Sequence, residues 1–346
     1  MVFYLLNKEL EVILPIDSYK SYIWTSRYYE PGDFELCLPA SEELLSAMQI
    51  GFFLVKEDDY TRAMIIFSIE ITTDIDEENQ IIVKGYCLKS LLDKRIIWSQ
   101  TVLKSKVEYA LRKLVTENAI SPTDTNRVIP FLRLGDEQGF TETMSAQYTG
   151  TNLGEAITEI CRANGYGYDI LLDIDEKTLT FTVYKGKDRS YKQEDNAWAV
   201  FSEDYENLLS SDYSYNTTAY KNVVKVAGEG EGKARKTASV GTASGFDRVE
   251  LFVDARDISS NEGEISDADY TNLLIERANE KIAECSTEEK IEGEIESSYN
   301  FILNEDYFLG DTVEVVNEYG IEMTPTITEI TESDDGQKNV VIKFES

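Results

Sequence analysis

Short apolar runs alternate with turn residues through the first hundred positions of the chain. Runs with strand-like spacing occur at Val2–Leu6, Val12–Ile16, Ser21–Ser26, Asp33–Leu38, Phe52–Lys56, Ala63–Thr72 and Gln80–Leu88. Ser41 and Gly51 bracket one short helical stretch, and the residues from Thr73 to Asn79 form a polar loop between the last two runs. Many short strands at this spacing are typical of a small β-barrel.

The hydrophobic period changes to that of helices after position 100. One helix is expected after Ser105, which has Glu108 three residues on, as in a capping box. A second is expected to begin at Asn152 and to stop at Gly165. The alternating residues that follow predict a hairpin, with strands Tyr168–Asp173 and Thr178–Tyr184.

Strand-like alternation returns in the last third of the chain. The runs there are Leu209–Tyr215, Asn222–Gly228, Thr237–Val240, Arg248–Ala255, Ile291–Ile295, Thr312–Val316, Thr326–Ile330 and Val340–Phe344. Ser266 marks the start of one helix, and Asp335-Gly336 is a strong hairpin turn. We therefore expect a mainly β protein with α+β insertions and two small β-barrels. The expected parts are a barrel at residues 1–100, an α+β unit at 101–205, and a second barrel at 206–346 with a helical insertion near 266–285.

Charge and composition narrow the possible functions. The formal net charge is −32, which disfavours nucleic-acid binding through a basic patch. The chain contains no histidine, which excludes Ser-His and Cys-His nucleophile pairs and histidine-based zinc sites. No apolar run is long enough to span a membrane, and the first residues lack the features of a signal peptide. We expect synthesis and folding in a cytoplasm, where the four cysteines would remain thiols.

Two segments resemble ligand loops only superficially. Gly228–Gly232 alternates glycine with glutamate, but it lacks the Lys-Ser/Thr of a phosphate-binding loop and places carboxylates where phosphate would lie. Asp169, Asp173, Asp175 and Glu176 could offer oxygen ligands to calcium, yet their spacing is not that of an EF-hand. A strand-connecting loop and a solvated hairpin are the simpler interpretations, and no cofactor or metal is indicated.

Carboxylates and tyrosines leave two other functions open. Glu203, Asp204 and Glu206 resemble an acid–base pair, as in a glycosidase, although no general acid in an apolar setting is recognisable beside them. Tyrosine occurs 21 times, and strand packing is the simplest interpretation, while interfaces and sugar grooves are the other places that suit its ring. A carbohydrate- or receptor-binding module is therefore the alternative to a purely structural role, and a carboxylate hydrolase is the weaker third.

Four segments together carry a family resemblance. They are Arg27–Leu36, Asn222–Gly232, Val249–Ile258 and Tyr307–Val313. In this order they resemble the tail-tip hub proteins of siphophages and prophages, the gene-product-thirty-seven-like family related to baseplate hub proteins. The similarity spans nearly the whole chain.

The resemblance implies synthesis in a bacterial cytoplasm, a structural role in the virion, at the phage tail tip, and no enzymatic activity. The alternative of carbohydrate or receptor binding would make the chain a binding module of the tail. It implies two barrel domains per subunit and a ring, a homotrimer, through which phage DNA passes. Expected partners are the protein itself, the distal tail protein, the tail tube or tape-measure protein, and tip or fibre proteins, without membrane insertion.

One acidic region suggests where such a channel could lie. Residues 286–346 hold sixteen acidic and three basic residues, a net charge of −13. A like-charged wall would let DNA slide, whereas a basic wall would hold it. Plain surface solubility explains the excess equally well. The candidate channel-lining residues are Glu314, Glu318, Glu322, Glu329 and Glu332.

Overall fold

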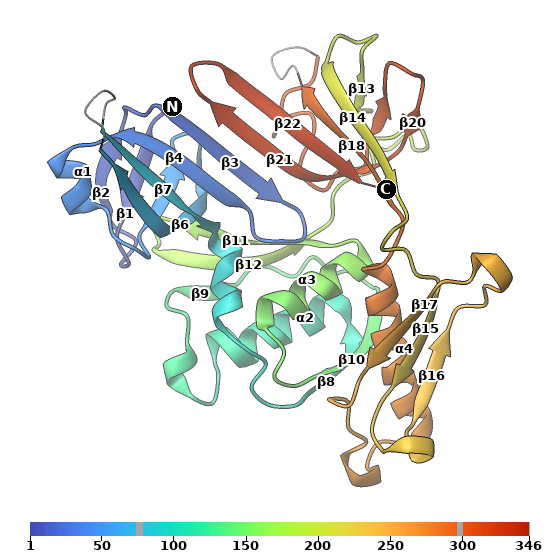
Figure 1. Ribbon diagram of the computed structural model, residues 1–346. Helices are drawn as coiled ribbons and strands as arrows, with labels where there is room; N and C mark the ends of the chain where they lie inside the picture. The colour runs from blue at the N-terminus through green and yellow to red at the C-terminus, as the bar shows by residue number, and fades with distance from the viewer. Residues whose placement is uncertain (74–78, 296–299, 346) are drawn as a thin grey trace.

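One antiparallel sheet of eleven strands dominates the computed structural model, which describes residues 1–73, 79–295 and 300–345. Strands from the two ends of the chain meet in this sheet (Figure 1). In spatial order they are β14 (Leu208–Asn216), β18 (Glu288–Ile295), β22 (Lys338–Glu345), β21 (Thr326–Asp334), β3 (Ser21–Arg27), β4 (Asp33–Pro39), β7 (Gln80–Cys87), β6 (Asp59–Thr72), β5 (Phe53–Lys56), β1 (Phe3–Leu6) and β2 (Val12–Ile16). The mainly β character expected from the sequence is confirmed.

The N-terminal strands β3 to β2 curl around one apolar core. The ring of Phe3 on β1 lies 5.4 Å from that of Tyr22 and 6.1 Å from that of Trp24, both on β3. Side chains thus meet across the interior, although no ladder joins β2 to β3 in the described residues. The helix α1 (Glu42–Ala47) connects β4 to β5, and Ser41 caps it as expected, accepting from the Leu44 amide at 3.1 Å. The polar loop predicted between β6 and β7 falls largely on residues 74–78, outside the described residues.

The C-terminal strands β14, β18, β22 and β21 cover a second core together with a small sheet. This sheet contains β13 (Val200–Ser202), β19 (Glu314–Val316) and β20 (Glu322–Met323). Phe201 lies at the centre, with its ring 5.1 Å from Tyr307 and 5.5 Å from Phe344. Both ends of each sheet remain open within the described ladders.

The expectation of two separate closed barrels therefore needs correction. Strand β3 of the first half pairs with β21 of the second, from Tyr22↔Asp334 to Arg27↔Glu329, so the two halves share one sheet. Alternation along a strand predicts which face is buried, but it does not specify which strand pairs with the strand at the edge of each half. Here the two edges pair with each other.

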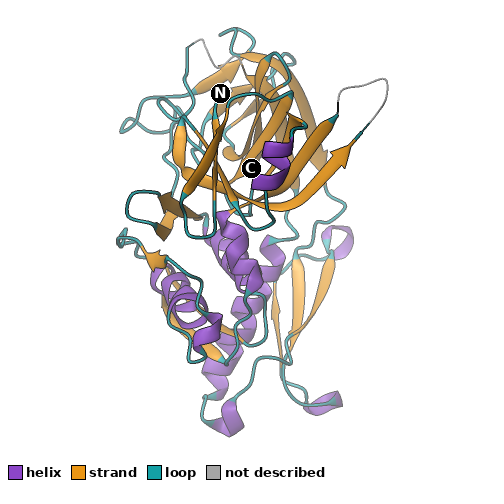
Figure 2. Ribbon diagram, turned by 90° about the vertical axis from the view of Figure 1, so that its left-hand side faces the viewer, coloured by secondary structure: helices purple, strands orange, loops and turns teal. Residues whose placement is uncertain are grey.

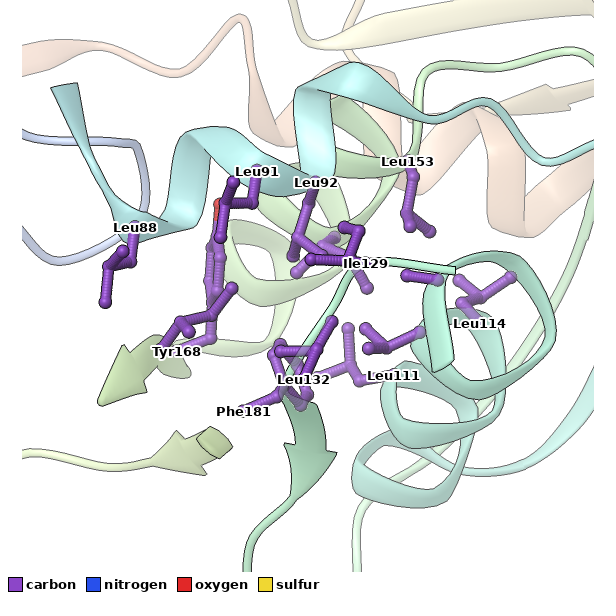
Figure 3. Close-up of a cluster of buried hydrophobic side chains, with 14 of the residues drawn as sticks. Leu88, Leu91, Leu92, Leu111, Leu114, Ile129, Leu132, Leu153, Tyr168 and Phe181 are labelled. Atoms are coloured by element: carbon purple, nitrogen blue, oxygen red, sulfur yellow. The ribbon is translucent and has the colours of Figure 1, made fainter. Parts of the chain in front are cut away.

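The residues between 88 and 184 form an α+β unit beneath the sheet, with its helices grouped below the strands (Figure 2). Its elements are the short 3₁₀, π and 3₁₀ segments η1 (Leu88–Lys94), η2 (Thr116–Ile120) and η3 (Thr125–Arg127), the helices α2 (Val107–Val115) and α3 (Leu153–Asn164), and the strands β8 (Thr101–Lys106), β9 (Leu132–Leu134), β10 (Thr143–Tyr148), β11 (Gly167–Asp173) and β12 (Thr178–Tyr184). Buried side chains from these elements fill one core (Figure 3).

The two predicted helices of this unit are present, but their caps differ from one another. Asn152 accepts from the Glu155 amide at 3.2 Å, and Gly165 ends α3 with φ of 67°, as expected. The capping box at Ser105 is wrong. Ser105 lies in β8, and the Glu108 carboxylate instead accepts from the backbone amides of residues 138, 139 and 140 at 2.6, 2.9 and 3.2 Å.

A further unit is inserted between the paired strands β14 and β18. It contains the strands β15 (Val223–Ala227), β16 (Thr237–Val240) and β17 (Glu250–Asp254), the turns η4 (Gly232–Ala234), η5 (Gly245–Asp247) and η6 (Asn261–Gly263), and the helix α4 (Asp267–Ala283). Ser266 caps α4 as expected, accepting from the Asp269 amide at 3.2 Å.

The packing of α4 differs from the expectation that it would lie on the second barrel. Its buried residues Leu274 and Ala278 share a core with Val224 and Val226 of β15. The apolar face of α4 therefore packs on the sheet of the inserted unit, not on the second half of the long sheet. The helix also contacts β10 and α3. No helix of the described part is long and apolar enough to cross a membrane.

Candidate functional site

One face of the long sheet, from β14 to the second half of β6, carries many charged side chains. Side chains alternate along each strand, so the face opposite the two cores carries every second residue. On β18, for example, Ile291 and Ile295 enter the core, and Glu292 and Glu294 point away from it. We call this surface the open face; Figure 1 looks onto its β22, β21, β3 and β4 part.

A row of charged residues crosses the open face over five neighbouring strands. The strand registers place Asp212 opposite Glu292, Glu292 opposite Lys343, Lys343 opposite Glu329, and Glu329 opposite Arg27. Directly opposed side chains in a sheet lie close enough to interact. The row therefore alternates in sign near its middle and ends in two adjacent carboxylates at β14.

The joint between the two halves of the chain lies within this row. Arg27 on β3 donates through Nε to Glu329 on β21 at 2.5 Å, and its Nη1 lies 2.5 Å from Asp33 on β4. Both Arg27 and Glu329 are partly buried, with 27% of each side chain exposed. The hydroxyls of Thr25 and Thr331, 3.3 Å apart, add a second side-chain link between the same strands.

Acidic residues outnumber basic ones on the open face. Its basic residues are Arg27, Lys84, Lys290 and Lys343. Its acidic residues are Asp33, Glu35, Glu70, Asp212, Glu288, Glu292, Glu294, Glu329 and Glu345. Nine carboxylates against four cations make the face negative, and three of the cations, Arg27, Lys84 and Lys343, form ion pairs with its carboxylates. Lys84, for example, lies 2.6 Å from Glu35.

The five glutamates predicted to line a channel do not come together. Glu329 belongs to the open face, whereas Glu332, three residues on, points to the core side and contacts Lys56 at 2.7 Å. Glu314 is buried in the small sheet, where it accepts from the Tyr191 amide at 3.2 Å. Glu318 and Glu322 are exposed around the turn that joins β19 to β20.

The residues that the prediction missed follow a signal already present in the sequence. Residues 288–295 read Glu-Glu-Lys-Ile-Glu-Gly-Glu-Ile, in which acids occupy alternate positions between the buried isoleucines. Such an alternation marks a strand with one charged face. The position of Lys343 and Arg27 beside these acids depends on strand order, which the local pattern does not contain.

The other candidate sites are dispersed by the fold. Asp169 is nearly buried and contacts Arg62, whereas Asp173, Asp175 and Glu176 are exposed around the turn of the hairpin. No group of three or more potential metal ligands gathers in residues 1–73, 79–295 and 300–345. In the glycine-rich loop, the Glu229 carboxylate already accepts from the Ser260 amide at 3.0 Å.

The carboxylates considered for acid–base catalysis are exposed to solvent. Glu203, Asp204 and Glu206 follow β13 on an exposed turn. A general acid of the glycosidase type needs an apolar surrounding that keeps its proton near neutral pH. This turn does not provide one.

Comparisons with known proteins agree with this architecture. The profile of the family described as "Siphovirus ReqiPepy6 Gp37-like protein" matches residues 2–344. The chain belongs to this family. It is accordingly a phage or prophage tail protein of a structural family that is generally non-enzymatic. Among curated proteins, no sequence matches the chain.

Solved structures with the same fold come from several bacteria. The tail protein from Neisseria meningitidis MC58 is 13% identical, with a TM-score of 0.59, covering 100% of this chain and 96% of that one. The 43 kDa tail protein of prophage MuSo2 from Shewanella oneidensis is 12% identical, with a TM-score of 0.60 and coverages of 99% and 98%. Prophage tail protein gp18 from Listeria monocytogenes EGD-e is 11% identical, with a TM-score of 0.52 and coverages of 100% and 94%. At such identities the likeness concerns the fold.

Proposed function

We propose that this Gp37-like protein is a hub subunit of the tail tip, which forms a ring with copies of itself around the path of the phage DNA. The open face of the long sheet would line the lumen of that ring. The observation that carries the proposal is the combination of a largely polar face, which exposes the apolar side chains of Ile23, Tyr86 and Val341 among its charged residues, with a free strand edge at each side. The family membership supplies the context, a phage tail.

The charge of the open face suits a surface that DNA passes without binding. DNA carries one negative charge for about every 1.7 Å of its axis, so a basic wall would retain it. The excess of carboxylates on the open face repels DNA instead, and the paired cations limit repulsion among the carboxylates. Of the five glutamates expected to line a channel, Glu329 lies on this face, together with Glu292 and Glu294.

The two edges of the open face are suited to contacts between copies. Strand β14 ends the sheet on one side. On the other side, β5 pairs with β6 only up to Ile65, and Gly51 and Phe52 extend this pairing to Ile66. Residues 67–72 of β6 therefore present unpaired backbone groups within the described residues. An unpaired edge readily accepts a strand from another chain, so β14 of one copy would meet β6 of the next.

The resemblance to hub proteins favours three copies, and cyclic symmetry closes such a head-to-tail contact. The three expected parts of the chain, residues 1–100, 101–205 and 206–346, would have different places in this ring. The first and third parts supply the sheet, while the middle part and the inserted α4 unit lie away from the lumen. We further propose that the distal tail protein, the tail tube or tape-measure protein, and tip or fibre proteins are the neighbours, and that the subunit catalyses no reaction.

Crosslinking tests the contact between edges directly. Ile71 on β6 and Leu209 on β14 are both more than half exposed, and a double Ile71→Cys/Leu209→Cys variant carries one thiol at each edge. A short bismaleimide should then give covalent species that end at the trimer. Pairing Ile71→Cys with Phe246→Cys, on the inserted unit, supplies the control. Equal crosslinking in both variants, or none at high protein concentration and high salt, would contradict the ring.

Light scattering gives an independent readout. Each copy carries a net charge of −32, so copies repel one another at low ionic strength. Salt screens such repulsion over about 8 Å at physiological strength. The proportion of the larger species should therefore rise with salt, and a fall would count against the proposal.

A further inference from the structure

Three exposed aromatic side chains surround a hollow on the second half of the protein. Tyr191, Trp198 and Tyr205 expose 50%, 50% and 52% of their surfaces. Val200, Asn300 and Phe301 complete the lining, and we call these six residues the aromatic hollow. Exposed apolar surfaces gathered in one place usually mark a binding site.

The aromatic hollow is held in shape by contacts of its own. The indole Nε1 of Trp198 donates to the Gln193 carbonyl at 3.0 Å, and the Trp198 ring stands edge-on to Tyr191 with centroids 5.1 Å apart. On the other side, the Asn300 amide donates to the Tyr205 carbonyl at 2.8 Å. Ligand binding would therefore require little ordering of the rings, which favours affinity.

The chain segment that carries the three rings of the aromatic hollow is strongly acidic. The segment from Tyr191 to Glu206 contains one basic residue, Lys192. Its acidic residues are Glu194, Asp195, Glu203, Asp204 and Glu206, all of them exposed. Beneath the hollow, the Glu314 carboxylate accepts from the Tyr191 amide. Both the faces of aromatic rings and carboxylates attract cations, so the rings and the acidic segment that carries them favour the same kind of ligand.

We propose that the aromatic hollow binds arginine or lysine side chains of a protein partner. The aliphatic stem of such a side chain would lie against the rings, and its charged group would face the acidic segment. A sugar is the less suitable ligand. It needs several polar groups aimed at its hydroxyls, whereas the polar side-chain groups of the lining are the Asn300 amide, the two phenols and the Trp198 indole N–H. The Asn300 amide nitrogen and the indole N–H are already engaged.

The aromatic hollow lies apart from the open face. Phe201 on β13 points into the core, so its neighbour Val200 points to the opposite side of the small sheet, toward the hollow. The small sheet and the strands of the open face enclose the core from different sides. Partner binding at the hollow can therefore be measured on the subunit whether or not copies form a ring.

Fluorine NMR on protein labelled with 5-fluorotryptophan separates the three tryptophans of the chain. Trp198 reports on the hollow, Trp24 is buried, and Trp98 is an exposed internal control that lies against Arg127. The probe is tetra-arginine amide in physiological salt, with tetra-citrulline amide as its neutral isostere and chitotetraose as a saccharide. The Trp198 signal alone should shift, saturably, with tetra-arginine.

Variants of equal charge exclude general attraction of the peptide to an acidic protein. Tyr205→Ala should weaken tetra-arginine binding roughly five- to tenfold, the range of a lost cation–π contact. Tyr215→Ala, which removes an exposed tyrosine from β14, should leave it within about twofold. The proposal is overturned if Trp198 does not respond, if Trp98 or tetra-citrulline responds equally, or if chitotetraose shifts Trp198 in place of tetra-arginine.

Discussion

Arg27 and Glu329 lie opposite each other on β3 and β21, separated by about three hundred residues of sequence, and their ion pair connects the two halves of the sheet. Arg27 also contacts Asp33 and donates to the Pro31 carbonyl at 3.0 Å. One side chain thus links β3, β21 and the turn that leads into β4. The two halves are therefore joined by contacts between particular side chains as well as by the backbone pairing of β3 with β21.

Arg27→Ala should lower the free energy of unfolding by about 1–3 kcal/mol, because it leaves partly buried acceptors without a donor. Urea denaturation followed by circular dichroism measures the change. Arg256→Ala serves as the control, since Arg256 pairs with Asp254 on the exposed surface. Equal stabilities of the two variants would show that the joint does not depend on Arg27.

The buried Glu280 of α4 should make stability depend on pH. Burial, opposed in part by Arg277 and by a hydrogen bond from Tyr148 at 2.9 Å, raises the pKa of Glu280 to about 7. Between the ordinary glutamate pKa near 4.5 and this value, the folded chain holds a proton that the unfolded chain has lost. The free energy of unfolding therefore falls as the pH rises through this window.

Glu280→Gln should remove this dependence, because glutamine can accept the Tyr148 hydrogen bond without ionising. Relative to the unmodified protein, the variant should gain about 3 kcal/mol between pH 4.5 and pH 8. Urea midpoints at several pH values provide the measurement, with Glu284→Gln, at an exposed position of the same helix end, as the control. If the free energy of unfolding changed with pH in the same way for both variants, the raised pKa of Glu280 would be refuted.

Glu108 is expected to hold the segment around Gly139 rather than to cap a helix. Its carboxylate accepts from three successive backbone amides, so Glu108→Ala should cost about 2–3 kcal/mol of stability. Hydrogen exchange should show faster exchange at residues 138–140. The neighbouring Glu137→Ala, at a largely exposed position, should leave the exchange unchanged. Unaltered protection in the Glu108 variant would contradict this role.

Local signals in the sequence predicted many elements correctly because their causes are local. Helix α3 begins at its cap Asn152 and ends at Gly165, through contacts within one turn of the helix. Asp335-Gly336 lies in the turn between β21 and β22, with φ of 110° at Gly336. The capping box failed at Ser105 because that residue pairs with Met144 in the sheet β8–β10. A strand partner about forty residues away decided the conformation.

The candidate site depended on information that no local pattern holds. Glu329 and Glu332 were grouped because both lie in an acidic stretch, yet an odd spacing along one strand sends them to opposite faces. A bulge between Ile327 and Glu329 further shifts which residues face the core. The open face itself arises from the pairing of β3 with β21, a contact between distant segments that alternation leaves unspecified.

Charge reversal on the open face should slow the release of DNA. Phage tails assembled with a Glu292→Lys/Glu294→Lys subunit would present a less negative wall, which retains DNA more strongly. The rate of ejection, followed with a DNA-binding dye, should fall while tails still assemble. Glu250→Lys/Asp247→Lys makes the same charge change on the inserted unit and should leave the rate unchanged. Equal rates in both mutants would argue against a channel lined by the open face.

Electron cryomicroscopy of intact tail tips tests the central claim most directly. The account predicts a closed ring in which β14 of each subunit adjoins β6 of the next, with Glu292, Lys343 and Glu329 facing the lumen. A ring in which the open face is turned outward, or a tip in which the subunit is present as a single copy away from the DNA path, would contradict it.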